Sequence, residues 1–250
     1  LHNYGDIQRK DIRIGDSIVV TRSGDVIPKV LRSLPEVRTG AEELILPPER
    51  CPECGELLHV GRTFVTCINA KCFGQVVQRI VHFGSRGAMN INGLGESMAT
   101  HIVKTLNIRS LEALLSYDFR AYAEGTTQKK TFHKLAAAID KTKKDTDPVR
   151  LLYSFGITGI GEVQAEEIVK YLHDKERILE AFFCDADLRE QLTEVQGIGE
   201  LTLAGINKFL SNEKVRDDIL NVIAMCSLKY PETSKNTDIL AGKTFVITGT

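Results

Sequence analysis

The chain has 250 residues, of which 42% are hydrophobic and 26% are charged, and its formal net charge is −1 with a pI near 6.7. This composition is typical of folded protein; it argues against a basic coat over the whole surface but allows local basic patches. No apolar run approaches the ~20 residues that span a bilayer and no signal peptide is visible, so we expect no membrane partner. Because residue 1 is Leu, we expect the chain to be a piece of a longer protein.

Residues 1–47 are expected to form strands. Two β-branched runs, residues 17–22 and 26–31, flank the sequence Ser23-Gly24-Asp25. Runs of this kind bounded by Gly and Asp predict a hairpin or meander, with Pro28 at a sheet edge or a strand end. Pro47-Pro48 then ends the unit.

Residues 49–76 carry four cysteines in two close pairs, Cys51 with Cys54 and Cys67 with Cys72. Two such pairs across a short loop suit four thiolates around one tetrahedral Zn²⁺, with Gly55 in a tight knuckle. Four protein ligands leave no open coordination position, so we expect a structural metal. The alternative is a pair of disulfides in a secreted protein, but nothing else in the sequence indicates an oxidising compartment.

Residues 77–230 are expected to be mainly helical and to contain a repeat. Two glycines enclose an apolar residue in three turns: Gly93-Leu94-Gly95, Gly159-Ile160-Gly161 and Gly197-Ile198-Gly199. A glutamate and a helical apolar pattern follow each turn. The first two turns start 66 residues apart, twice 33, which predicts a further copy near residue 126.

The four copies share one helical register. Positions six, nine, ten and thirteen residues after each start are apolar in every copy except at Asn207; they are Ala99, Ile102, Val103, Leu106, Phe132, Leu135, Ala136, Ile139, Ala165, Ile168, Val169, Leu172, Leu203, Ile206 and Leu210. The second copy departs from the others because Thr126 and Gln128 stand where glycines are expected, and only Gly125 survives just upstream. We expect this copy to pack structurally or to hold phosphate less directly.

The glycine pairs point to a phosphate ligand. Glycine allows close approach of the backbone to another molecule and takes up positive φ without steric cost. The first N–H groups of a helix lack internal partners and, with the helix dipole, form an anion site. A dinucleotide fingerprint is the first alternative, but its third glycine and a surrounding βαβ unit are missing. The second alternative is a tight interhelical turn without a ligand, which four copies in one register make less attractive.

Basic residues surround the second copy. Six lysines lie within sixteen residues and only Asp140 opposes them: Lys129, Lys130, Lys134, Lys141, Lys143 and Lys144. Their charge could replace the missing glycines through salt-sensitive phosphate contacts. The alternative is a solvated helix face. Further along, residues 231–239 read as a polar linker, and residues 240–250 as one strand that begins a truncated domain.

The order of these pieces carries a family resemblance. The turns and their helices resemble the helix-hairpin-helix motif, and the whole series is similar to the C-terminal half of bacterial NAD-dependent DNA ligases. Residues 1–3 and 9–16 resemble that family's OB-fold domain, residues 86–91 its entry to the helical domain, and the last strand the start of its BRCT domain.

The resemblance implies a multidomain α+β chain. Its expected parts are a partial OB β-barrel (1–48), a four-cysteine zinc finger (49–76), a mainly α domain of four helix-hairpin-helix motifs (77–230), a linker (231–239) and the start of a BRCT domain (240–250). We expect the four motifs to pair into two pseudo-symmetric units, because one motif alone buries little apolar surface.

The resemblance also implies an activity in DNA replication and repair. Such enzymes seal nicks in duplex DNA: they adenylate a lysine from NAD, pass AMP to the 5′-phosphate and let the 3′-hydroxyl displace it, with Mg²⁺. The lysine lies in a Lys-x-Asp-Gly motif that this sequence lacks. We therefore expect no catalytic residue here and no reaction of this chain alone with NAD. The implied role is a DNA clamp on nicked duplex DNA, as a monomer in the bacterial cytoplasm at the nucleoid.

The expected DNA contacts fall on three groups of residues. They are Arg22, Val26 and Ile27 of the strand region, the turn glycines Gly93, Gly95, Gly159, Gly161, Gly197 and Gly199, and the lysines Lys141 and Lys143. Arg22 is always charged and can pair with phosphate. Val26 and Ile27 could pack against sugars near a nick or simply fill the barrel. Two other functions are considered: a non-catalytic DNA-binding module of another repair protein or topoisomerase, and a protein-interaction scaffold.

Overall fold

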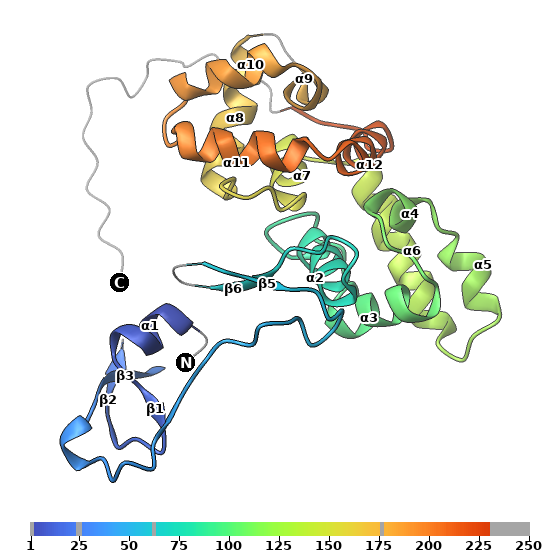
Figure 1. Cartoon of the computed structure of the whole chain (residues 1–250). Coiled ribbons are helices and arrows are strands. Elements are labelled where there is room, and N and C mark those ends of the chain that lie inside the picture. The colour runs from blue at the N-terminus through green and yellow to red at the C-terminus, as the bar shows by residue number, and fades with distance from the viewer. Residues whose placement is uncertain (1–2, 24–26, 62–63, 176–177, 231–250) are drawn as a thin grey trace, which may run out of the picture. The chain divides into compact units, whose positions relative to one another are not determined.

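The computed structural model describes residues 3–23, 27–61, 64–175 and 178–230 (Figure 1). The chain divides into two compact units, one of residues 1–80 with 99–109 and one of residues 81–98 with 110–250. All described strands belong to the first unit, whereas helices dominate the second. The expected mixture of helix and sheet is therefore confirmed. The predicted linker and final strand, residues 231–250, lie outside the described residues.

The first unit opens with a helix, α1 (Tyr4–Arg9), where strands alone were expected. The side chain of Asn3 caps this helix by accepting a hydrogen bond from the Asp6 N–H at 2.9 Å. Asn is a preferred N-cap residue, and the carboxylate of Asp6 in the first turn suits the helix dipole. The prediction of strands was wrong here because six residues are too few to show a helical period.

The described strands pair into three two-stranded antiparallel sheets. Strand β1 (Arg13–Ile14) pairs with β4 (Glu43–Leu44), β2 (Ile18–Ser23) with β3 (Ile27–Ser33), and β5 (Leu58–Val60) with β6 (Val65–Cys67). A short 3-10 helix, η1, spans Pro35–Val37. The predicted hairpin is confirmed as β2–β3, which carries a bulge at Val19/Val20. Within the described ranges the strands do not close a barrel.

A partly buried ion pair links distant parts of the strand region. The guanidinium of Arg38 donates to both carboxylate oxygens of Asp16 at 2.7 Å and to Asp11 at 2.6 Å. The Asp16 side chain has no exposed surface, and the Arg38 hydrogen bonds lower the pKa of its carboxyl to about 2. Many apolar side chains in this region remain exposed, so its own core is small; they include Ile14, Val20, Ile27, Leu31, Leu44 and Leu46.

The remaining regular elements of the described residues are helices. Their bounds are α2 Phe73–Gly84, α3 Glu96–Thr105, α4 Leu111–Ser116, α5 Phe119–Glu124, α6 Lys129–Lys144, α7 Pro148–Ser154, α8 Glu162–Asp174, α9 Leu179–Cys184, α10 Ala186–Glu190, the 3-10 helix η2 Gln191–Glu194, α11 Glu200–Leu210 and α12 Glu213–Ala224. Of the helices described, none combines the length and the apolar character needed to cross a bilayer.

The repeat positions form much of the helical core. All four predicted core residues of α6 and all four of α8 are buried, as are Ala99, Ile102 and Val103 of α3. In α11, Ile206 and Leu210 are buried while Asn207, the one polar exception, faces solvent. Leu106 and Leu203 are only partly buried. The spacing of apolar residues thus predicted the buried face of each helix.

Candidate nucleic-acid interface and metal centre

Three turns of the same geometry precede α3, α8 and α11. Their first glycines, Gly93, Gly159 and Gly197, have φ angles of +92°, +89° and +82°, a region that strongly favours glycine. The apolar residue that follows donates its N–H to a carbonyl three residues back: Leu94 to Ile91 at 3.1 Å, Ile160 to Ile157 at 3.0 Å and Ile198 to Val195 at 3.1 Å. The sequence-predicted turns therefore share one backbone conformation.

The middle residue anchors each turn while the glycines stay accessible. Leu94, Ile160 and Ile198 are 4%, 5% and 3% exposed, so their side chains reach the core. The glycines on either side are exposed, except for Gly161, which is half-buried. An anchored turn with an accessible backbone can present its amides to an external group.

The three turns differ in what their amides already bind. The Gly161 N–H donates to Oε1 of Gln164 at 3.1 Å, so a side chain caps the start of α8. For the equivalent amides of Gly95 and Gly199, no acceptor is found among the described residues. Unused amides at a helix start are the donors that an anion requires.

The third and fourth turns pack against each other reciprocally. A Cβ placed on Gly159 would lie 3.1 Å from Cγ2 of Thr202, and one on Gly197 would lie 3.5 Å from Nε2 of Gln164. Gln164 and Thr202 each stand five residues after the first glycine of their own turn. Equivalent residues thus contact equivalent partners, which is the arrangement of a pseudo-symmetric pair.

The loop before the first turn is held by the neighbouring helix α7. Nε of Arg150 donates to the Ala88 carbonyl at 2.7 Å, and the same guanidinium also bonds the Arg86 carbonyl. A polar pocket of about 240 Å³ opens beside this loop, lined by Asn90, Asn92, Lys141, Thr142 and Arg150 among others. Sequence reasoning missed Arg150, because one arginine on a short helix carries no distinguishing pattern.

The second turn lacks the features of the other three. Gly125 ends α5 with a φ of −95°, and Gln128 begins α6 without a capping side chain. Thr127, at the place of the buried middle residue, is exposed. The second copy therefore has no glycine turn, as expected from Thr126 and Gln128 at the positions where the other copies have glycines.

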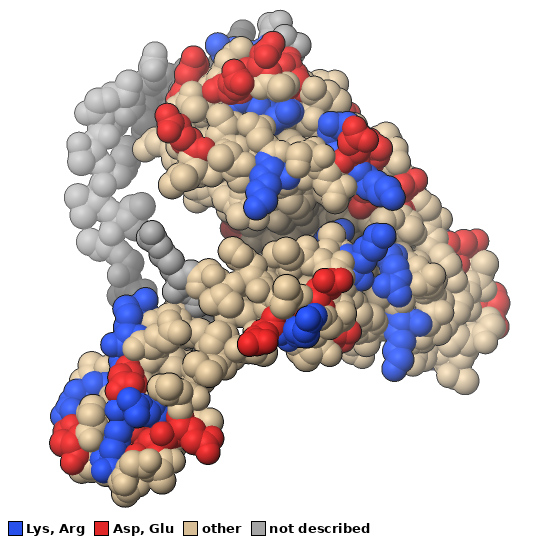
Figure 2. Space-filling view, in the orientation of Figure 1, with Lys and Arg blue, Asp and Glu red and all other residues tan. Residues whose placement is uncertain are grey.

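The lysines of α6 differ in their surroundings, and Lys129 is paired with Glu124. Lys130, Lys134, Lys141 and Lys144 are exposed and, at spacings of four, seven and three residues, lie on one helix face; we call them the lysine stripe. Lys143 points elsewhere and donates to the Leu115 carbonyl at 3.2 Å. Asp140 is paired with Arg120 at 2.5 Å. Elsewhere the basic and acidic side chains are intermixed on the face seen in Figure 2.

The strand-region candidates do not form one cluster. Arg22 pairs across the hairpin with Pro28, whereas Ile27 pairs with Ser23, so Arg22 and Ile27 lie on opposite faces of the β2–β3 ribbon. Ile27 is 69% exposed and therefore does not fill a core in this structure. Val26, the third candidate, lies outside the described residues.

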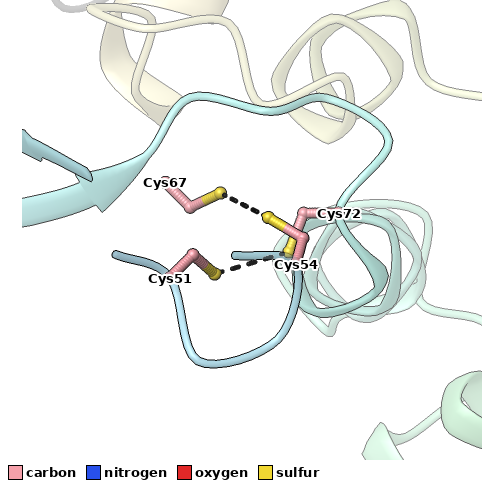
Figure 3. Close-up of side chains that lie close together, drawn as sticks. All are labelled: Cys51, Cys54, Cys67 and Cys72. Carbon is pink, nitrogen blue, oxygen red and sulfur yellow. Dashed lines mark hydrogen bonds between the residues drawn. The ribbon is translucent and has the colours of Figure 1, made fainter. Parts of the chain in front are cut away.

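The four cysteines converge on one point (Figure 3). Their Sγ atoms all lie within 4.8 Å of one another, with 3.8 Å between Cys51 and Cys72 and 3.6 Å between Cys54 and Cys67. Four sulfurs at Zn–S distances of ~2.3 Å in a tetrahedron are ~3.8 Å apart, so the site fits Zn²⁺. The separations are too long for disulfides, which need ~2.05 Å.

Backbone turns shape the cysteine cluster. Gly55, with φ +73°, donates its N–H to the Cys51 carbonyl at 2.8 Å and closes the first knuckle. The Cys72 N–H donates to the Asn69 carbonyl at 2.9 Å in the second. Amides of Cys54 and Glu53 lower the pKa of the Cys51 thiol to about 7, whereas burial raises that of Cys72. The remaining cysteines, Cys184 and Cys226, are not in the cluster.

Comparison with known proteins gives one consistent family. Residues 1–42 match the NAD-dependent DNA ligase OB-fold domain. Over the whole chain the sequence is 34% identical to a DNA ligase of Methylacidiphilum infernorum, 34% to one of Anoxybacillus flavithermus and 35% to one of Rubrobacter xylanophilus. The chain spans 36–37% of the length of these relatives. The similarity along the full length of the chain, together with the family match at residues 1–42, supports a fragment of a bacterial NAD-dependent DNA ligase.

Proposed function

We propose that this chain binds duplex DNA for an NAD-dependent ligase and holds it around the nick to be sealed. The observation that carries the proposal is the set of anchored glycine turns, in which a buried apolar residue leaves the amides of Gly95 and Gly199 unused at helix starts. Contacts of this kind fix the register of a protein on DNA without reading its sequence.

The turns would meet the phosphates from their glycine side. A glutamate follows each pair, as Glu96, Glu162 and Glu200. These carboxylates favour the helix dipole but repel a phosphate, so the anion must approach the glycine amides rather than the helix axis. Gly93, Gly159, Gly161 and Gly197 complete this proposed contact set.

The lysine stripe supplies a second kind of contact. Its four ammonium groups replace backbone amides at the turn that has no glycine pair, and each releases counterions when it meets a phosphate. Lys141 also lines the pocket beside Asn92, next to the first turn. Lys143 is the weaker candidate, because its ammonium is already bound to the Leu115 carbonyl. In the strand region, exposed Arg22 is proposed as a phosphate contact and Ile27 and Val26 as sugar contacts.

The cysteine cluster is proposed to hold one structural Zn²⁺ through Cys51, Cys54, Cys67 and Cys72. When bound, the ion would cross-link the two knuckles, and with four thiolate ligands it would have no open position for chemistry. The boundaries proposed for the parts are residues 1–48, 49–76, 77–230, 231–239 and 240–250, with helix-hairpin-helix motifs in the third and the start of a BRCT domain in the last.

Nick sealing with NAD and Mg²⁺ is proposed for the whole protein, acting as a monomer on chromosomal DNA in the bacterial cytoplasm, at the nucleoid. This sequence contains no Lys-x-Asp-Gly motif. The chain alone should therefore form no covalent adenylate with labelled NAD, and a labelled band would contradict that assignment.

Binding of a fluorescent duplex, with and without a central nick, tests the proposed function. We expect binding at low salt, tighter for nicked than for intact duplex, with an affinity that falls steeply as salt rises. No binding to either duplex at low salt would contradict the proposal and favour a protein-interaction scaffold.

A further inference from the structure

Two apolar side chains stand in solvent at equivalent places of the third and fourth turns. Val163 is 67% exposed and Leu201 is 92% exposed. Each is the second residue of its helix, α8 or α11, and follows the first glycine of its turn by four residues. The first and second copies carry polar residues at this place, Ser97 and Lys130.

Folding gives no reason for these two residues. A side chain as exposed as that of Leu201 buries almost no area and contributes little to stability. Valine is also a weaker helix former than most polar residues. Isolated exposed apolar residues are common and need no explanation. Here, however, the exposure recurs at one position in two copies that pack against each other.

Each of these two residues is next in sequence to the residue that contacts the opposite turn. The next residue after Val163 is Gln164, which approaches Gly197, and the next after Leu201 is Thr202, which approaches Gly159. Both residues thus lie in the first turn of a helix whose next residue contacts the paired turn. The unused Gly199 amide lies two residues from Leu201.

We propose that Val163 and Leu201 pack against deoxyribose edges in the minor groove of duplex DNA, one on each strand. This inference rests on the proposed function. The two strands of a duplex are antiparallel and related by local twofold axes. The reciprocal contacts of the two turns are those of a pseudo-twofold pair. A sugar joins directly to each phosphate, so an amide-held phosphate brings apolar C–H surface within reach of a neighbouring side chain. Proteins that bind the minor groove frequently bring apolar side chains, leucine among them, against the DNA.

Salt dependence separates this contact from a charged one. An apolar contact displaces water but releases no condensed counterion. Losing it should weaken binding by the same factor at every salt concentration. Losing a lysine should instead change the slope of log Kd against log salt.

The test uses the 250-residue chain with Leu201→Ser and Val163→Ser, and anisotropy of a nicked duplex over a salt series. We expect Leu201→Ser to weaken binding about fivefold and Val163→Ser about threefold, from partial burial of each side chain, with unchanged slopes. The matched control is Ile178→Ser, which removes another exposed apolar side chain (59%) of the same unit away from the turns and should leave Kd unchanged. Thermal melts should coincide for all variants.

Three results would overturn this inference while leaving the proposed function intact. Unchanged affinity in both serine variants would show that the side chains do not touch DNA. A changed salt slope would show that the effect is electrostatic. A wild-type chain that sediments as a dimer, beside a Leu201→Ser variant that sediments as a monomer, would assign the surface to a second copy. Failure of the wild-type chain to bind any duplex would contradict the proposed function itself, and this inference with it.

Discussion

The strand-and-cysteine region, residues 3–72, and the helical region, residues 73–224, are stabilised by different means. In the helical region, the repeat positions fill a dense core, with Phe83, Phe132 and Phe182 showing no exposed surface. In the strand-and-cysteine region, apolar residues such as Ile14, Leu46 and Phe64 remain exposed. Specific side-chain contacts stabilise this region in place of a large apolar core. They are the Arg38–Asp16 ion pair and the cluster of four cysteine thiols. Removing one of these contacts should therefore destabilise the surrounding strands more than removing an exposed apolar side chain does.

Metal removal should give the largest effect. Binding of a structural Zn²⁺ contributes on the order of 10 kcal/mol to the folding of small metal domains. We expect chelation, or Cys72→Ser, to abolish the ordered amide signals of β5 and β6 while helical circular dichroism is largely kept. Metal analysis should find one zinc per wild-type chain. Ordered β5–β6 signals in a metal-free sample would show that the cluster is not what holds this segment.

A matched pair of phenylalanine substitutions tests the contrast in cores. Phe182→Ala removes a fully buried ring and should lower the unfolding free energy of the helical region by about 3–5 kcal/mol. Phe64→Ala removes a ring that is 57% exposed and should change stability little. Denaturant unfolding followed by circular dichroism measures both. Equal effects of the two substitutions would refute the contrast.

The Arg38–Asp16 pair should make the strand region sensitive to acid. The pKa of Asp16 is depressed to about 2, below its unfolded value of ~3.9, so its contribution is complete above the unfolded value and is lost as pH falls towards 2. Arg38→Met should raise this pKa towards the unfolded value, which carbon-detected NMR titration of the carboxyl can follow. An unchanged Asp16 titration in that variant would remove Arg38 as the cause.

The smallest effects should come from removing exposed basic side chains that the fold does not need for its stability. Arg22→Gln and Lys141→Gln should each reduce the salt slope of DNA binding by about 0.9 without altering thermal stability. Lys143→Gln should change the slope less than Lys141→Gln, because the Lys143 ammonium is bound to the Leu115 carbonyl. Equal slopes for wild type and Lys141→Gln would take the lysine stripe out of the interface.

Local spacing made much of this molecule predictable from sequence. The glycine turns, the buried repeat positions and the convergence of Cys51, Cys54, Cys67 and Cys72 all depend on residues close together in the chain. The missed features join distant residues: Arg38 to Asp16, 22 positions apart, and Arg150 to Ala88, 62 apart. The division among the lysines also needed structure, because only the contact with Leu115 sets Lys143 aside. The sequence also could not show which turn amides are already hydrogen-bonded, because the bond from the Gly161 N–H depends on the rotamer of Gln164.

The central claim is that DNA approaches the backbone of the glycine turns, and Gly199→Ala tests it most directly. A Cβ on Gly199 would have nothing within 4 Å and its φ of −96° suits alanine, so the fold should be unaffected. Gly125→Ala at the turn without a glycine pair is the control, since its Cβ would meet only the Tyr122 carbonyl at an ordinary 3.8 Å. The account predicts about tenfold weaker binding of nicked duplex for Gly199→Ala, because each ~1.4 kcal/mol lost is tenfold, and wild-type binding for Gly125→Ala. Wild-type binding by both variants, with both folded, would contradict it.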